Sequence, residues 1–430
     1  MAHQVKRLKL RIFPFRGTLA PLSNSDYRLL LSSNILWWQT TFMEMIVMGW
    51  LALELTDSAW QVALIGFYRS LPFLFAGFVS GPIIDRFGRR NVILGALTAN
   101  LLISTTITLL LWLDRLLFWH LALGAVLMGA AWALDWPARR ALVPDLVGRE
   151  QTLDAMLLEN FAQNISRILG PFISGSLIEF FGARGCYTVL AGITGLSLLL
   201  LLGLSKQPIP RLTKPPQSPW AHVGEGLRYV RHNQPILGVL LVTMVMNLMI
   251  FPYMSLLPVF ARDILQQGPI GLGLLGAASG VGAFIGLFLI SRIRHLVSHG
   301  WIFALGSCFQ SLALLGFATS TTFTVSLILL MLSGIGHACF GTMQSSIILL
   351  AASDEMRSRA MGTLVLAIGA GPPGRLEMGA LAEAIGAPWA VGLNAALSAL
   401  SIIFIAAALP DFRQKTVERR EAPTLIVTDR

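Results

Sequence analysis

Long hydrophobic segments alternate with short polar connections along almost the whole chain. A membrane core about 30 Å thick is crossed by a helix of about 20 residues, which is close to the length of most of these segments. The pattern therefore predicts an all-α integral membrane protein with twelve membrane-spanning helices. Their expected bounds are 29–53, 61–84, 91–113, 117–138, 152–180, 186–204, 236–261, 270–291, 300–319, 322–350, 360–384 and 388–409.

The composition excludes a water-soluble globule. Of the 430 residues, 55% are hydrophobic and 13% are charged, whereas soluble domains carry about 25% charged residues. The net charge of +10 is not gathered into a basic domain outside the apolar segments, so nucleic acid is not an expected partner. Cys186, Cys308 and Cys339 lie in or beside apolar segments without paired spacing, so neither a disulfide framework nor a metal site is expected.

The positions of the basic residues predict the orientation of the chain. Of the 32 Lys and Arg residues, only Arg115, Arg184 and Arg262 fall on the side opposite the termini, apart from three that lie within spans. Basic residues accumulate on the cytoplasmic side of membrane proteins. Both termini are therefore expected in the cytoplasm, with the chain in the plasma (inner) membrane.

A proline-rich polar connection at 205–235 divides the spans six plus six. Its five prolines prevent one continuous helix before Trp220, and the stretch from there to Asn233 is expected to form an amphipathic helix on the membrane surface. The expected organisation is a basic N-terminal segment (1–28), a six-helix bundle (29–204), this linker (205–235), a second six-helix bundle (236–409) and a cytoplasmic tail (410–430).

A repeated motif relates the two halves. Five residues of the fifth span recur 204 positions later: Gly170, Gly175, Leu177, Glu179 and Gly182 reappear as Gly374, Gly379, Leu381, Glu383 and Gly386. Five identities at a single offset predict that the fifth and eleventh spans are structurally equivalent.

The connection between the second and third spans combines glycine with charge. It contains Gly81, Asp85, Arg86, Gly88, Arg89 and Arg90. Glycines permit close helix approach and a sharp turn, and arginines are typical of the cytoplasmic face. The order Gly-x-x-x-Asp-Arg-x-Gly-Arg-Arg resembles the loop 2-3 motif of the major facilitator superfamily. In that superfamily the Asp pairs with other helices and latches one of two alternating states, so the resemblance implies a conformational latch here.

Two further patterns narrow the resemblance. Gly170, Pro171, Ser174 and Gly175 are similar to the motif that marks exporters of the superfamily, although Ser166 and Ser174 replace two of its glycines. Small residues with a proline allow close packing and a bend, and an ordinary packing face is the alternative interpretation. Runs at 136–147 and 357–362 resemble the branch of enterobactin-type siderophore exporters and transmembrane secretion effectors. This resemblance implies two six-helix bundles around a central cavity, and export as the activity.

Ionisable residues within spans are the candidates for proton coupling, because they are costly at depth and usually face a cavity or a partner. They are Glu44, Arg69 and Asp135. Arg69 is expected to pair either with Glu44 or with an anionic ligand, and Asp135 to join a cytoplasmic charge cluster with Arg139 and Arg140. A structural hydrogen bond is the alternative for Glu44.

The first and seventh spans border the central cavity in this fold, which suggests a set of substrate contacts. The candidates are Trp37, Trp38, Gln39, Met246 and Asn247, with Arg375 and Glu377 from the eleventh span. Trp offers a broad apolar surface and Met adapts to varied shapes, so the set suits a bulky amphipathic compound. Interhelical or lipid-facing packing is the alternative for each.

No catalytic, phosphate-binding or metal-binding motif occurs in the sequence, so neither an enzyme nor a cofactor is expected. The sequence predicts a monomeric secondary transporter that exports a small amphipathic, siderophore-like or drug-like compound by alternating access. Proton antiport is the expected driving force, and protons and the lipid bilayer are the expected partners besides the substrate. The alternatives are an importer or lipid-flipping permease of the same fold, and a non-transporting receptor or scaffold.

Overall fold

A computed structural model describes residues 19–205, 228–293, 296–353 and 356–414, and within these ranges it contains helices and no strand. The expected amphipathic helix at 220–233 and the basic and C-terminal segments lie largely outside the described residues. The structure is therefore informative chiefly about the membrane-embedded part of the chain.

The first half of the chain forms six helical elements. They are η1 (Ala20–Ser23), α2 (Ser25–Thr56), α3 (Ala59–Ser70), α4 (Phe73–Phe87), α5 (Arg89–Trp112) and α6 (Phe118–Leu202). Within α6 the backbone is non-helical at Gly148 and Gly182, with φ values of 74° and 67°. Glycine adopts positive φ without steric cost, so these two residues divide α6 into three segments that match the fourth, fifth and sixth expected spans.

The second half follows a similar order with more breaks. Its elements are α8 (Gln234–Val245), η2 (Met246–Ile250), α9 (Tyr253–Val259), η3 (Phe260–Ile264), α10 (Pro269–Ile293), α11 (His299–Thr319), α12 (Phe323–Ala351), α13 (Arg357–Ile368), α14 (Gly371–Ile385), α15 (Ala387–Ala408) and η4 (Pro410–Arg413). The first four elements together cover the seventh expected span, and α13 with α14 covers the eleventh. Gly386 has a φ of 88°, as its counterpart Gly182 has positive φ, which is consistent with the repeat.

Within the described residues, eight helices are long and apolar enough to cross a membrane, or nine if the bent pair of α3 and α4 is one span. The number is consistent with twelve expected spans, because the segment Glu150–Leu202 contains two of them on either side of Gly182. The helix α2 is rich in polar residues, and the eleventh span is broken into two short helices. Each expected span therefore coincides with helical segments of the structure.

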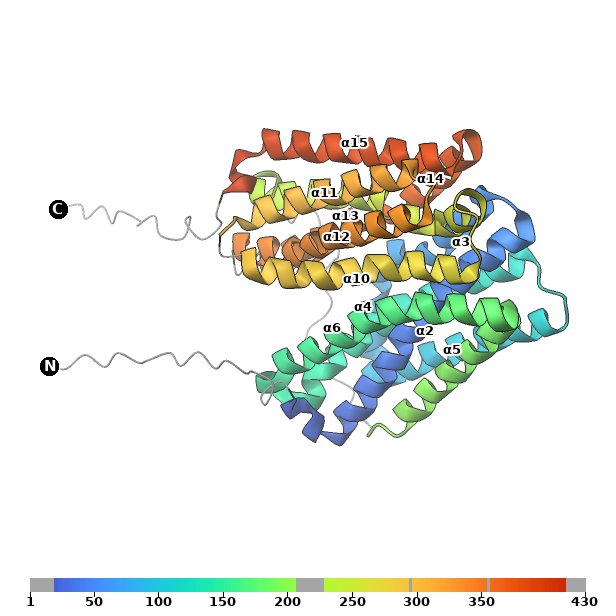
Figure 1. Cartoon of the computed structure of the whole chain (residues 1–430). Helices are drawn as coiled ribbons and strands as arrows, with labels where there is room; N and C mark the ends of the chain where they lie inside the picture. Colours follow the sequence, from blue (N-terminus) through green and yellow to red (C-terminus); the bar gives the residue numbers. More distant parts are fainter. Residues whose placement is uncertain (1–18, 206–227, 294–295, 354–355, 415–430) are drawn as a thin grey trace, which may run out of the picture.

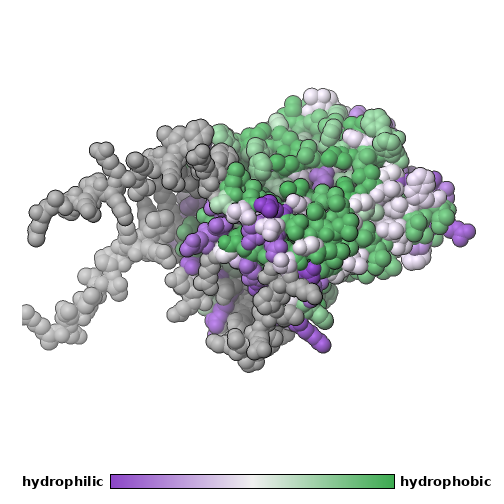
Figure 2. Space-filling view, turned by 90° about the horizontal axis from the view of Figure 1, so that it is seen from below, coloured by the Kyte–Doolittle hydropathy of each residue, from purple (hydrophilic) through white to green (hydrophobic). Residues whose placement is uncertain are grey.

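The helices form two bundles that lie side by side (Figure 1). One contains α2, α4, α5 and α6, the other contains α10 to α15, and α3 reaches across to the second bundle. The first and last described elements, η1 and η4, lie at the same end, which we call the terminus end; the opposite end is the far end. Figure 2 shows hydrophobic residues over much of the face seen from below, as expected for a surface in contact with lipid.

Candidate functional site

A buried polar network lies inside the first bundle, toward the terminus end. Arg139 of α6 donates from Nε to Asp135 at 2.8 Å and from Nη1 to Asn34 of α2, which in turn donates to Glu159 at 2.8 Å. Ser33 accepts a further bond from Arg139 at 3.2 Å. Asp135 and Arg139 are 0% and 3% exposed, so their pairing satisfies charges that water cannot reach. Asp135 thus pairs with Arg139 as expected, but in the bundle interior instead of at the surface.

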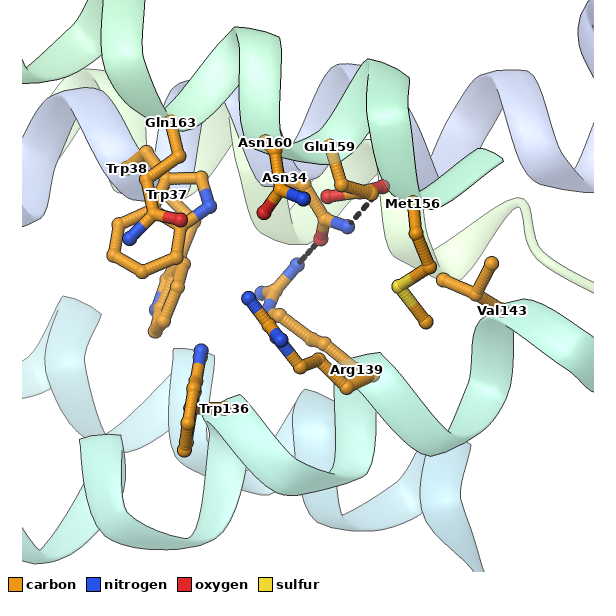
Figure 3. Close-up of a pocket in the computed structure, with 11 residues that line it drawn as sticks. Asn34, Trp37, Trp38, Trp136, Arg139, Val143, Met156, Glu159, Asn160 and Gln163 are labelled. Atoms are coloured by element: carbon orange, nitrogen blue, oxygen red, sulfur yellow. Dashed lines mark hydrogen bonds between the residues drawn. The ribbon is translucent and has the colours of Figure 1, made fainter. Parts of the chain in front are cut away.

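Aromatic side chains border this network and form one side of a cavity (Figure 3). The cavity is small, with about 20 Å³ of free space, and Trp37, Trp38 and Trp136 lie to one side of Arg139 and Glu159. The Arg139 guanidinium lies 5.1 Å from the centre of the Trp37 ring, a cation–π distance. Charged, amide and aromatic groups therefore meet in one place, which suits a ligand with both apolar and polar parts.

A second small polar cavity, with about 20 Å³ of free space, lies in the same bundle and is lined in part by Glu44 and Arg69. Arg69 Nη1 lies 2.5 Å from Glu44 Oε1, close enough for an ion pair although the two atoms are not aligned as a hydrogen bond. Polar residues of four other positions complete the lining: Thr40, Thr41, Asn100 and Thr194. Of the two partners expected for Arg69, the structure therefore places Glu44 beside it.

The remaining candidate contacts occupy different surroundings. Gln39 has a buried amide nitrogen without a hydrogen-bond partner among the described residues. Met246 is fully buried, with its sulfur 3.9 Å from Ser398 of α15, which places it in the core of the second bundle. Asn247 donates to the Thr243 carbonyl at 2.9 Å.

The two candidates on α14 also differ from each other. Glu377 is exposed and accepts from Asn394 at 3.1 and 3.3 Å. Arg375 is half-buried, and its Cδ lies 3.1 Å from the position that a Cβ on Gly66 would take. Arg375 therefore lies against the first bundle, whereas Glu377 does not share its surroundings.

The structure adds Arg167, which sequence reasoning did not select. It lies in the middle segment of α6, and its Nε is buried without a hydrogen-bond partner among the described residues. Tyr253 of α9 and His337 of α12, both from the second bundle, lie within electrostatic range of it. The only signal in the sequence is an arginine inside an apolar span, which does not indicate the bundle that it faces.

The residues of loop 2-3 lie at the terminus end, and their contacts stay within the first bundle. Arg89 pairs with Asp145, and Arg90 donates to the carbonyls of Leu204 at 3.0 Å and Leu202 at 3.1 Å. Gly88 has a φ of 82°, which explains the glycine at this sharp turn. Asp85 is exposed and has no ion-pair partner among the described residues. The remaining motif residues, Gly81 and Arg86, are also exposed.

The exporter-type motif lies where α6 packs between α2 and α10. A Cβ on Gly170 would approach Phe42 to 2.6 Å, and one on Gly175 would approach the Pro269 carbonyl to 2.4 Å. Ser174 donates to the Met43 carbonyl at 3.0 Å, so a small hydroxyl replaces glycine without loss of contact. Pro171 packs against Gly276 of α10. The small residues therefore permit close contact within the first bundle and across to the second.

Several hydrogen bonds and an ion pair join the two bundles at the far end. Glu383 of α14 accepts from the Ser58 hydroxyl at 3.2 Å and from the Trp60 amide at 3.3 Å. Arg262 of η3 pairs with Asp57 and donates to the Leu53 carbonyl at 3.4 Å. The structure is thus a state in which the bundles are joined at the far end.

The sequence matches the family model described as transmembrane secretion effector over residues 16–428. The chain belongs to this family of the major facilitator superfamily. It is therefore a multi-pass membrane protein of a transporter family and not an enzyme. Among the described residues, no three His, Cys, Asp or Glu side chains gather as metal ligands.

Curated relatives and solved structures agree with this family. The chain is 28% identical over 386 residues to the multidrug efflux pump Tap of Mycobacterium tuberculosis, covering 86% of this chain and 89% of the relative. It is 26% identical over 376 residues to the enterobactin exporter EntS of Salmonella typhimurium, covering 84% and 87%. The fold resembles a bacterial homologue of the lysosomal transporter Spinster, with a TM-score of 0.68, 14% identity and coverage of 92% and 97%.

Proposed function

We propose that the protein exports a small amphipathic compound, drug-like or siderophore-like, from the cytoplasm by alternating access. The observation that carries the proposal is the set of hydrogen bonds and ion pairs that joins the two bundles at the far end. The similarity to an efflux pump and to an enterobactin exporter supports the direction of transport. With the termini in the cytoplasm, as the basic residues favour, the joined far end faces outward, which suits a state that loads its substrate from the cytoplasm.

Proton antiport is the proposed driving force, with the pair of Glu44 and Arg69 as its coupling group. The pair lies in a polar cavity inside the first bundle, and the Glu44 side chain is 10% exposed. A carboxylate in this position can hold a proton when its arginine moves away and release it when the pair re-forms. Asp135 is less suited to this role, because Arg139 is held between it and Asn34.

The loop 2-3 motif is the proposed latch of the opposite state. Asp85 is exposed in the present state, while Arg89 and Arg90 bind within their own bundle. When the bundles close at the terminus end, Asp85 is positioned to meet the second bundle. We expect Asp85→Asn to slow export without changing the binding of substrate.

Proteoliposomes containing the native protein test the function. Proton movement and export are measured together for a panel of catecholate siderophores, macrolides and lipophilic cations. Export of at least one compound with counter-movement of protons is expected, and Glu44→Gln should abolish the proton movement. The matched control is Glu54→Gln on the same helix, because Glu54 accepts from the Trp50 indole at 2.6 Å and lies outside the cavity of Glu44 and Arg69.

Three outcomes would overturn parts or all of this proposal. Transport of a compound without proton movement in the native protein would remove the antiport mechanism and leave export or facilitated movement. Movement of a fluorescent phospholipid between leaflets, with no compound of the panel exported, would favour a lipid-flipping permease. Absence of all three activities would favour a receptor or scaffold.

A further inference from the structure

Positive charge without a matching carboxylate lies at the boundary between the two bundles. Arg167 reaches toward the second bundle, and its Nε is enclosed without a hydrogen-bond partner among the described residues. Of the titratable groups described, Tyr253 and His337 lie near Arg167 on the second bundle, and neither is a carboxylate. None of these groups supplies a permanent negative charge.

Arg375 presents the same imbalance from the opposite bundle. Its side chain lies against Gly66 of α3, and its Nη1 is near Gly371, where the Asn247 amide oxygen also approaches. The titratable group that acts on it is Arg69, a second cation. Glu377, the nearest acidic residue along the same helix, instead accepts from Asn394.

The two arginines lie at similar depth. By the offset of 204 residues that relates the two halves, Arg375 corresponds to position 171, which is one helical turn from Arg167. One turn is about 5.4 Å along the axis. Arg375 precedes the break at Gly386, and Arg167 precedes the break at Gly182, so both lie well inside their spans from the far end.

An uncompensated cation at this depth is costly, and such groups usually have a partner or line a substrate pathway. Glu44 is the carboxylate close to this region, and it is already paired with Arg69 at 2.5 Å. A guanidinium offers several donors in a fixed geometry that suits carboxylate and other oxyanions. An anion that enters between the bundles would supply the missing charge.

We propose that the exported compound is an amphipathic anion whose acidic group, a carboxylate or phenolate, binds at the bundle boundary to Arg167 and Arg375. This inference rests on the proposed export function and specifies its substrate class. Asn247 lies beside Arg375, with its amide oxygen on the side of Gly371, and Tyr253 lies beside Arg167. The apolar part of the compound lies along the surrounding helices.

Binding of two probes of matched shape and opposite charge tests the sign of the site. Tetraphenylborate and tetraphenylphosphonium are equilibrated with the full-length protein in phosphatidylcholine nanodiscs, and binding to protein-free nanodiscs is subtracted. The native protein should bind the borate more tightly. Arg167→Gln and Arg375→Gln should each weaken borate binding about tenfold, as expected for loss of one of the positive charges that attract the anion.

Two variants control for damage to the fold. Arg375→Lys keeps the charge and should retain most of the borate affinity. Arg184→Gln makes the same change at an exposed arginine that pairs with Asp114 outside the bundle boundary, and its affinity should be native. Equal or tighter binding of the phosphonium, or native borate binding in both glutamine variants, would overturn the inference.

A further arm separates a soluble substrate from a lipid headgroup, because both can present an oxyanion. Phosphatidylglycerol is added to the nanodiscs, and displacement of the borate by this lipid would assign the site to lipid and overturn the substrate class. The outcomes are distinct from failure of export. If borate binding depends on the arginines but no compound is transported, the anion site is supported and the export function is not. If cations are exported by the native protein and by both glutamine variants, export is supported and the anion site is not.

Discussion

The two bundles share a fold and a sequence repeat, yet their interiors differ in charge. The first bundle encloses two ion pairs, Glu44 with Arg69 and Asp135 with Arg139. The second bundle has no buried ion pair among its described residues, and its interior is held by neutral bonds such as Gln344 to Thr243 at 2.8 Å. Equivalent packing is therefore reached with two different kinds of interior.

This difference places the buried pairs of carboxylate and arginine in the first bundle. Neutral hydroxyl and amide groups keep their hydrogen bonds at any physiological pH, whereas a carboxylate paired with arginine changes its contacts when it is protonated. Buried ion pairs are also weak contributors to stability compared with apolar packing. We therefore interpret the charged interior of the first bundle as functional, and the neutral interior of the second as a scaffold against which the first one moves.

The largest expected effect comes from breaking the buried pair in the first bundle. Arg139→Gln would leave Asp135, which is 0% exposed, without its counter-ion. Removing one partner of a buried pair costs about 3–5 kcal/mol, so the thermal midpoint of the detergent-purified protein should fall strongly. Size-exclusion chromatography after heating measures this change. The double variant Asp135→Asn with Arg139→Gln should recover part of the loss, and a native midpoint in the single variant would contradict the buried-pair account.

The second prediction concerns Glu44 in the first bundle and Glu377 in the second. For a proton antiporter, a gradient of one pH unit, acidic outside, supports an about tenfold gradient of substrate per exchanged proton. Glu44→Gln should remove this response, because the amide cannot carry the proton. Glu377→Gln should keep it, since Glu377 only accepts from Asn394. Uptake of substrate into everted vesicles at imposed pH gradients measures the response of both variants. Loss of the response in Glu377→Gln but not in Glu44→Gln would place the coupling group in the second bundle instead of the first.

Most of the fold follows from the sequence, because apolar runs of about 20 residues set the spans directly. What the runs do not reveal is how a span breaks. The change from α3 to α4 comes at Leu71, directly before Pro72, and the break at Gly369 comes shortly before Pro372. Both lie inside apolar runs, and a proline interrupts the helix at each. The turn at Gly182 was easier to predict, because its glycine recurs as Gly386.

Less of the candidate site than of the fold could be predicted from the sequence. Glu44 and Arg69 were selected because intramembrane charge is rare, and their possible pairing followed from that rarity. Arg167 was not selected from the sequence, because one arginine in a span does not indicate which helices face it. Its neighbour Tyr253 is 86 positions away in the chain. Met246 was selected as a substrate contact, but the structure places it in the core. A methionine of a cavity-lining span can point to either side, and the sequence does not distinguish the two.

The third prediction tests how the second bundle holds the first at the far end. Glu383 accepts two bonds from the segment Ser58–Trp60, whereas its repeat counterpart Glu179 lies near Gly268 in the other direction. Removing the charge in Glu383→Gln should weaken closure by about 1 kcal/mol, since exposed charged contacts contribute little. Distances between spin labels on the two bundles at the far end measure the open fraction. Glu179→Gln is the matched control on the first bundle, and an unchanged distribution in both would show that apolar packing alone closes this end.

The smallest expected effect comes from replacing one buried serine by alanine in each bundle. Each bundle contains a buried serine pair, Ser33 with Ser197 at 2.8 Å and Ser311 with Ser398 at 3.1 Å. Replacing either Ser33 or Ser311 by alanine removes a hydrogen bond of about 1 kcal/mol, so both variants should show a similar small decrease in thermal midpoint. Export should respond only to Ser33→Ala, because Ser33 also accepts from Arg139 and so helps to position a charged group. Equal export defects in both variants would mean that packing, and not charge, distinguishes the two bundles.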